Sequence, residues 1–153
     1  METFEIISIQ WEYSGIRILD VYNSQEFTSI SDEQNILYQV YGFSPIYGND
    51  KLLYIGLTSK DYNTRISQHL KRIFSRGLSL EVVIGKIDEK YHDRLEEIES
   101  ILIAHHKPSY NSKYITKIKM TEEMNNVMIH NHGYKRDLLL ECSNIWWLDN
   151  EKK

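Results

Sequence analysis

The chain has 153 residues and a mass of 18.2 kDa, the size of one ordinary domain. Aromatic residues make up 12% of it and charged residues 26%, a balance that excludes a largely disordered chain. The lone Cys142 excludes a disulfide framework and a cysteine-based zinc site. No apolar run is long enough to cross a bilayer and no basic leader precedes the first strand, so we expect a cytoplasmic protein without membrane contact.

The formal net charge of −4 is unevenly distributed along the chain. Residues 1–34 contain seven acidic residues and one arginine, whereas residues 51–76 contain six basic residues and one aspartate. A net negative charge predicts weak non-specific binding to DNA, because that binding depends on cations that neutralise phosphates. The basic middle of the chain is the part suited to a phosphate, although a charged run is commonly only a solvated face.

The first third of the chain favours β-structure. We expect strands over residues 4–11 and 16–22, separated by Ser14-Gly15, and then a polar loop. A hairpin follows, with strands over residues 36–43 and 51–57. Its turn contains Pro45 and Gly48-Asn49-Asp50.

The rest of the chain alternates helix and strand. Helical periodicity begins after Asp61 and ends at Gly77, and residues 78–87 return as a strand. Asp88 is expected to cap a second helix that ends before Pro108. Residues 126–130 and 137–147 are predicted to form a C-terminal hairpin around Asn131-His132-Gly133.

These elements predict one α+β domain over residues 1–153. Its centre would be a small antiparallel three-stranded sheet flanked by helices, in the order ββαβα over residues 36–111. Extra β-strands would come from the flanking extensions, residues 1–35 and 112–153.

Basic side chains recur along one side of the first predicted helix. They are spaced at i, i+4, i+7 and i+11 and comprise Arg65, His69, Arg72 and Arg76. Guanidinium groups suit phosphate because they are always charged and donate bidentate hydrogen bonds. A solvated basic helix face explains the same periodicity, so both interpretations stay open here.

Glu99 differs from the other glutamates of the second predicted helix. It lies beside the buried stripe, so its carboxylate is expected at the edge of the core, where a charge must be paired or bind a cation. A single carboxylate suits Mg²⁺, which keeps most of its waters. Glu96 and Glu97 are expected to be solvated. His105 and His106 are expected to be protonated at the helix C-terminus, which favours imidazolium.

Two tyrosines, Tyr38 and Tyr54, come from neighbouring strands of the predicted hairpin. Gly56 permits close approach of backbone or substrate. Cross-strand packing alone would also explain the tyrosines. The adjacent Trp146 and Trp147 are expected to pack in the core rather than to stack on bases.

Four segments, taken together, resemble the GIY-YIG nuclease family. Ile36-Leu37-Tyr38 and Tyr54-Ile55-Gly56 are similar to the two motifs that name it, although the first has Ile-Leu-Tyr in place of Gly-Ile-Tyr. Residues 64–70 look like its first helix with an arginine and a histidine, and residues 99–111 look like its closing signature, which begins at a glutamate. The four occur in order over about half of the chain.

The resemblance implies a metal-dependent endonuclease that hydrolyses DNA phosphodiester bonds with Mg²⁺ or Mn²⁺. The implied catalytic residues are Tyr38, Tyr54, Arg65, His69, Glu99 and Asn111. Glu99 would hold the metal and Arg65 the scissile phosphate. Tyr38 is the family's favoured general base, with Tyr54 and His69 positioning or relaying protons, and His69 stays open as the base because it titrates near neutral pH. The residues expected to contact DNA are Gly56, Lys60, Arg72 and Arg76.

Several points stay open at this stage. The substrate could be a specific site or a branched structure, and the role restriction, repair or recombination, or that of a phage or mobile element. A homodimer or a protein partner is compatible with the chain. The alternative function is a catalytically silent module that binds nucleic acid or protein and retains the fold. The presence of both Arg65 and Glu99 favours the enzyme.

Overall fold

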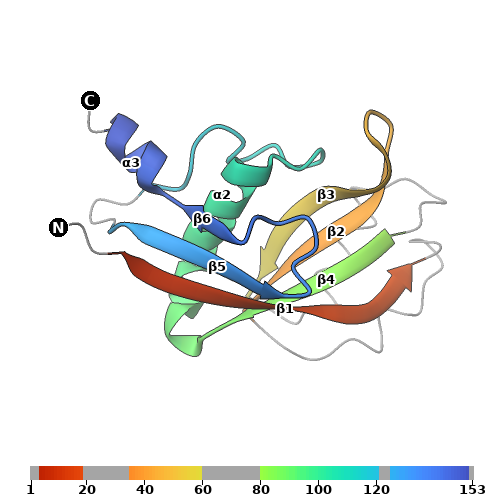
Figure 1. Ribbon diagram of the computed structural model, residues 1–153, viewed down its shortest axis with the longest axis horizontal. Helices are drawn as coiled ribbons and strands as arrows, with labels where there is room; N and C mark the ends of the chain where they lie inside the picture. Colours follow the sequence, from red (N-terminus) through yellow and green to blue (C-terminus); the bar gives the residue numbers. More distant parts are fainter. Residues whose placement is uncertain (1–3, 19–34, 60–79, 121–124, 152–153) are drawn as a thin grey trace.

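The structure is a computed structural model that describes residues 4–18, 35–59, 80–120 and 125–151 (Figure 1). Its strands are β1 (Glu5–Ile18), β2 (Ile36–Ser44), β3 (Gly48–Thr58), β4 (Leu80–Ile87), β5 (Val127–Gly133) and β6 (Glu141–Ser143). Its helices are the 3₁₀ helix η2 (Glu89–Arg94), α2 (Leu95–His106) and α3 (Ile145–Glu151).

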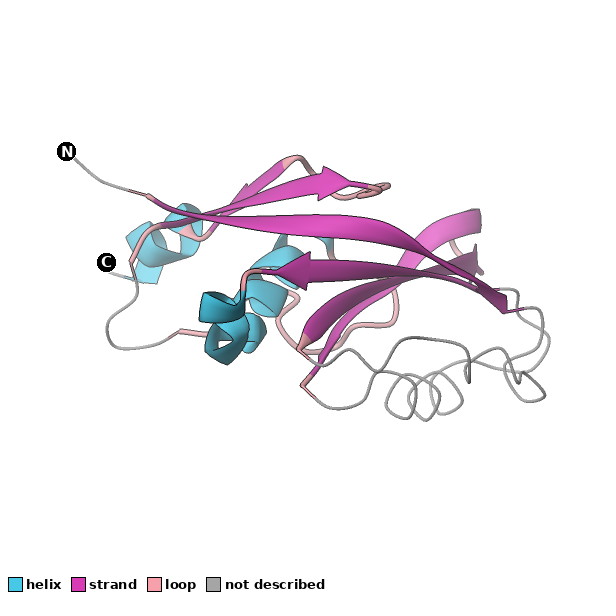
Figure 2. Ribbon diagram, turned by 90° about the horizontal axis from the view of Figure 1, so that it is seen from below, coloured by secondary structure: helices cyan, strands magenta, loops and turns pink. Residues whose placement is uncertain are grey.

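The six strands form one mixed sheet in the order β3-β2-β4-β1-β5-β6. Neighbouring strands pair antiparallel except β1 and β5, which are parallel. Helix α2 contacts β3 at one edge of the sheet and β6 at the other. The sheet therefore curls around one side of α2 like half of a barrel (Figures 1 and 2).

The predicted small three-stranded sheet with flanking helices is wrong. The sheet continues from β4 through β1, β5 and β6, and the described residues are mostly strand with two short α-helices. The parallel pairing of β1 with β5 joins the two ends of the chain, and no local pattern marks such a contact. The helix predicted between Asp61 and Gly77 lies outside the described residues.

Several local predictions are confirmed. The hairpin exists as β2 and β3, and Tyr38 lies directly opposite Gly56. The Asp88 side chain accepts a hydrogen bond from the Lys90 N–H at 3.1 Å and so caps η2, which leads into α2. Helix α2 ends where Lys107 adopts a left-handed conformation (φ 46°), directly before Pro108.

Other local predictions are wrong. One strand, β1, runs through Ser14-Gly15, and the expected break is only an irregularity of register between Tyr13 and Arg17. Strand β5 continues through the residues predicted as a turn because they pair with β1. The strand predicted over residues 137–147 is replaced by a loop, the short β6 and helix α3.

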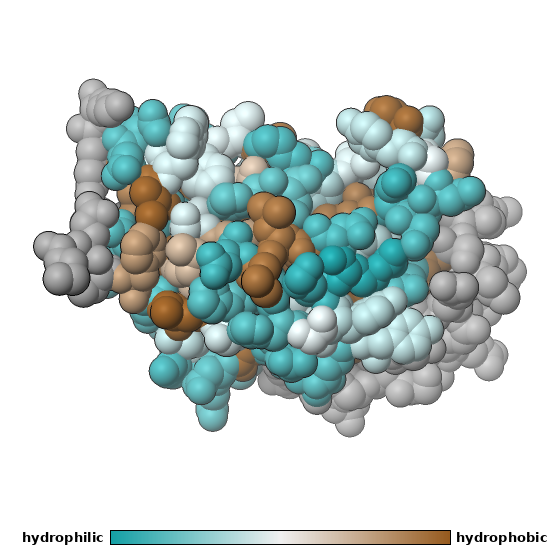
Figure 3. Space-filling view, viewed as in Figure 1, coloured by the Kyte–Doolittle hydropathy of each residue, from teal (hydrophilic) through white to brown (hydrophobic). Residues whose placement is uncertain are grey.

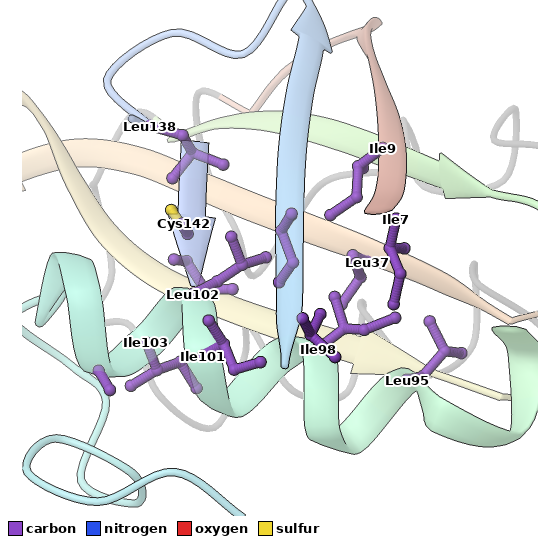
Figure 4. Packing of buried hydrophobic residues seen from close by; sticks show 14 of the residues in the cluster. Ile7, Ile9, Leu37, Leu95, Ile98, Ile101, Leu102, Ile103, Leu138 and Cys142 are labelled. Atoms are coloured by element: carbon purple, nitrogen blue, oxygen red, sulfur yellow. The ribbon is translucent and has the colours of Figure 1, made fainter. Parts of the chain in front are cut away.

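The core lies between the sheet and α2. Ile98, Ile101 and Leu102 of α2 are fully buried against strand residues such as Ile9 and Leu37 (Figure 4). Burial of one such side chain contributes roughly 1.5–3 kcal/mol relative to its exposure to water. The α2 residues recur at helical spacing and the strand residues at alternate positions, as a helix packed on one face of a sheet requires.

Two side chains fasten β1 to the C-terminal part of the chain. Trp11 donates its indole N–H to the amide oxygen of Asn131 at 2.9 Å, and Asn131 donates to the Leu139 carbonyl at 2.8 Å. Both side chains are buried. The Trp11 ring also lies over Gly85, where a Cβ atom would come within 2.6 Å of the ring.

Apolar side chains on the surface are concentrated at a few places. The tip of the β2–β3 hairpin exposes Ile46 and Tyr47, and Figure 3 shows brown atoms over this tip at the upper right. Trp146 is 63% exposed whereas Trp147 packs in the core, so the expected burial of both tryptophans is right for one of them. Among the described residues, no helix has the length and hydropathy of a membrane span.

We predict that Asn131→Ala lowers the free energy of unfolding by about 1–3 kcal/mol, because it leaves the buried Trp11 N–H without its acceptor. Chemical denaturation measures the change. Asn49→Ala, at an exposed position in the β2–β3 hairpin, is the control. Equal stability of the two variants would contradict the role given to Asn131.

Candidate active site

Strand β3 forms one edge of the sheet, and its outward-facing backbone groups are bound by residues of α2 and the segment after it. The Tyr110 N–H donates to the Leu53 carbonyl at 2.8 Å. Ile55 donates its N–H to the Asn111 amide oxygen at 3.0 Å and accepts from the Asn111 amide nitrogen at 2.9 Å. These contacts satisfy polar groups that a bare edge strand would present to other chains.

Glu99 continues this row of contacts. Its carboxylate is half-buried and accepts a hydrogen bond from the backbone of Leu57. Three alternate residues of β3 are therefore bound in turn by Tyr110, Asn111 and Glu99. The prediction that Glu99 lies at the edge of the core is confirmed.

The two predicted tyrosines pack together over Gly56. Their ring centroids are 6.0 Å apart, with an angle of 34° between the ring planes. A Cβ atom at position 56 would lie 2.5 Å from Cζ of Tyr38 and 2.6 Å from Cε1 of Tyr54, so only glycine fits there. Because strand side chains alternate, these residues lie on the face of the sheet opposite Leu37 and Ile55, which pack in the core.

The electrostatic surroundings of Glu99 disfavour its charged form. Burial, followed by the nearby Glu96 charge, raises the pKa of the Glu99 carboxyl to about 7. Lys113 and the Leu57 backbone act in the opposite direction and only partly offset these effects. A half-buried carboxylate of this kind favours a proton or a cation.

Glu96, one helical turn before Glu99, has the opposite character. It accepts hydrogen bonds from Lys119 Nζ at 2.6 Å and from the Tyr114 hydroxyl, with Lys113 Nζ at 3.4 Å. These donors, Lys119 above all, lower the pKa of Glu96 to about 2. Glu96 therefore stays ionised and adds its negative field to the surroundings of Glu99.

The structure brings together part of the predicted site. Five of the predicted residues lie in β3 or contact it. Tyr54 and Gly56 are in the strand, and Tyr38 packs against both. Glu99 and Asn111 bind the backbone of the strand. The other predicted residues, Lys60, Arg65, His69, Arg72 and Arg76, lie outside the described residues.

Two expectations about polar side chains of α2 are wrong, those for Glu97 and His106. Glu97 is buried and bonded to Arg94, which also binds Glu5 of β1. The side chain of Glu96 is 42% exposed, in keeping with the expectation, but its donors are distant in the sequence and no pattern indicated them. His106 places its ring between the Leu102 carbonyl and the Leu139 N–H, and burial lowers its pKa, so the helix end does not hold an imidazolium there.

The side chains of the described residues suit a metal ion that keeps most of its waters better than one bound entirely by protein groups. The described residues contain no group of three or more histidine, cysteine, aspartate or glutamate side chains placed to hold a metal. Glu99 fits Mg²⁺ or Mn²⁺ as a single ligand, because Mg²⁺ commonly binds one or two carboxylates and keeps several waters. Neutralisation by a cation would also relieve the repulsion between Glu99 and Glu96.

The chain matches no protein-family model, no curated protein and no solved structure. The resemblance to the GIY-YIG nucleases therefore depends on the four sequence segments alone.

We predict that Glu99→Gln stabilises the protein more at about pH 8 than at about pH 5. A carboxyl whose pKa is raised in the folded state contributes stability below its unfolded pKa, and that contribution is lost as the pH rises through about 7. Glutamine does not titrate, so the stability difference should grow by on the order of 1–3 kcal/mol across this range.

Denaturation at several pH values measures this difference. Glu89→Gln is the control. It removes an exposed carboxylate at the start of η2, so it shows the effect of losing one negative charge without a change at Glu99. The same pH dependence in both variants would contradict the environment described for Glu99.

We also predict that Asn111→Ala makes the Ile55 amide exchange its hydrogen faster, since Asn111 is its acceptor. The effect should be at least tenfold if the lost bond contributes about 1.5 kcal/mol. Amides of β2 paired within the sheet should keep their protection. Ser112→Ala changes an exposed neighbour and is the control. Unchanged exchange of Ile55 would contradict the contact.

Proposed function

We propose that this protein is a divalent-metal-dependent endonuclease that hydrolyses DNA phosphodiester bonds. The supporting observation is that Glu99 and Asn111, from α2 and the segment after it, bind the backbone of β3, the strand that carries Tyr54 and Gly56 and pairs with the strand of Tyr38. These are the described members of the residue set that the family resemblance implies. The contacts of Glu99 and Asn111 with β3 support the resemblance, because they join residues that are distant in the sequence and no local pattern requires them.

Glu99 is the proposed metal ligand. Its carboxylate is held by α2 on one side and by the Leu57 backbone on the other, so its position is fixed before a cation arrives. A divalent cation bound there would stabilise the negative charge that develops on the leaving oxygen. The raised pKa means that protons compete with the cation below about pH 7.

Tyr38 is the proposed general base for the attacking water, with Tyr54 and His69 placing or relaying the proton. Tyr38 is only 1% exposed and its ring is fixed against Gly56 and Tyr54, which restricts the positions of its hydroxyl. An ordinary tyrosine has a pKa near 10, so this role needs nearby cations that lower it. His69 would accept a proton near neutral pH without such help.

The proposed phosphate-binding residues come from the basic middle of the sequence. Arg65 would bind the scissile phosphate and stabilise its additional negative charge in the transition state. Lys60, Arg72 and Arg76 would contact neighbouring phosphates. Asn111 has a positioning role, because its amide is already occupied by both backbone groups of Ile55.

Cleavage of supercoiled plasmid and of a branched-junction oligonucleotide tests the proposal. With Mg²⁺ or Mn²⁺, wild type and the control Glu89→Gln should cut, while EDTA or Glu99→Gln should reduce cutting by at least about a hundredfold. The product pattern separates site-specific from structure-specific action. Tyr38→Phe, assayed in parallel, should be strongly impaired if tyrosine is the base.

Metal binding has a readout that does not depend on activity. Mg²⁺ should raise the melting temperature of wild type above pH 7 and leave that of Glu99→Gln unchanged, because a ligand stabilises only the state that binds it. Equal cutting by wild type and Glu99→Gln would contradict the assignment of Glu99 as the metal ligand. Binding of DNA without cutting of any substrate would favour the catalytically silent module.

A further inference from the structure

The segment that follows α2 is strongly basic. Residues 107–119 contain four lysines, Lys107, Lys113, Lys117 and Lys119, and no aspartate or glutamate. The side chain of Lys113 is 73% exposed and that of Lys119 is 41% exposed, and Lys117 is also exposed. Lys107 differs because its ammonium group donates to the carbonyls of Ala104 and Ile115.

This segment has no helix or strand, yet specific contacts fix its backbone along its length. Tyr110 and Asn111 attach its first part to β3, and Figure 1 shows the chain leaving α2 and looping toward that strand. The Thr116 carbonyl accepts from the Trp147 indole N–H at 3.1 Å. The Lys119 N–H donates to the Ser100 hydroxyl at 2.8 Å. The lysines therefore project from a backbone held against α2 and β3.

The contacts place two of these lysines, Lys113 and Lys119, close to Glu99. Lys113 and Lys119 bind Glu96, which lies one helical turn from Glu99, and the positive charge of Lys113 lowers the pKa of Glu99 itself. Of the described carboxylates, Glu96 is the one that ion-pairs with this group. Two lysines thus share the single negative charge of Glu96, and the exposed Lys117 lies between them in the sequence, so positive charge remains in this described segment next to the proposed metal ligand.

We propose that Lys113, Lys117 and Lys119 form a binding surface for DNA backbone phosphates that flank the bond cut at Glu99. The inference rests on the proposed nuclease function and adds a substrate-binding surface outside the basic stretch of residues 51–76. Phosphate contacts of this kind position a duplex without reading its sequence. This protein has a net negative charge and would be repelled by DNA as a whole. The lysine surface supplies local positive charge at the side where DNA would approach.

Fluorescence anisotropy with a labelled short duplex and a labelled junction, in EDTA so that nothing is cut, tests the surface. Lys113→Gln/Lys117→Gln should weaken binding severalfold at about 100 mM salt. It should also reduce the slope of log affinity against log salt by about 2, because each lost phosphate contact removes about 0.9.

The matched control is Lys86→Gln/Lys90→Gln, which removes the same charge. Lys86 pairs with Glu12 at 3.1 Å, as Lys113 pairs with Glu96, and Lys90 is exposed like Lys117. Lys113→Arg/Lys117→Arg keeps the charge and should bind like wild type. Thermal unfolding of all three variants shows that each is folded when assayed.

The outcomes separate this inference from the proposed function. Wild type and both glutamine double variants could bind DNA equally well, with the same dependence on salt. That result would overturn the proposed lysine surface and leave the nuclease proposal standing. Lysine-dependent binding without cutting in Mg²⁺ or Mn²⁺ would support the surface and overturn the nuclease proposal. No binding of either DNA by wild type at low salt would overturn both.

Discussion

The candidate site depends on one constraint, namely that the edge strand β3 must satisfy the backbone groups that face away from the sheet. Asn111 does this for Ile55 with the acceptor oxygen and the donor nitrogen of one planar amide, which match the adjacent N–H and C=O groups of a strand residue. Asn111 follows α2 closely, so the same contact holds the end of α2 against β3. Glu99 is thereby kept against Leu57, one contact further along the strand.

This arrangement holds a carboxylate where its charge is unfavourable. Glu99 is half-buried and lies near the ionised Glu96, so the folded protein carries a local electrostatic cost above neutral pH. Glu96 is stabilised by Lys119, Tyr114 and Lys113, so its own charge is favourable, but that charge adds to the cost of ionising Glu99. Local destabilisation at one group beside fully paired neighbours is typical of a site that binds a charged ligand.

Contacts between residues close in the sequence were predictable and distant ones were not. The β2–β3 hairpin, β4 and α2 follow from periodicity, a cap and turn residues, and Tyr38 accordingly lies opposite Gly56. The parallel pairing of β1 with β5 has no local signature. Residues 145–151 contain two tryptophans, which favour strands, yet the chain forms α3 there because packing of Trp147 and Leu148 outweighs that preference. The lowered pKa of His106 was not predictable either, because it follows from burial, and the Leu139 N–H that its ring accepts is distant in the sequence.

The terminal strands are continuous with the site and do not form separate modules. β1 lies between β4 and β5, and the Trp11–Asn131 hydrogen bond fastens it to the C-terminal strands in the interior. On the other side of the core, His105 and His106 of α2 bond the backbone of Ser143 and Leu139. The helix that carries Glu99 is thus held by β3 at one sheet edge and by the β5–β6 region at the other. Any target bound by the C-terminal residues would be held in a fixed position relative to Glu99, because both rest on the same helix.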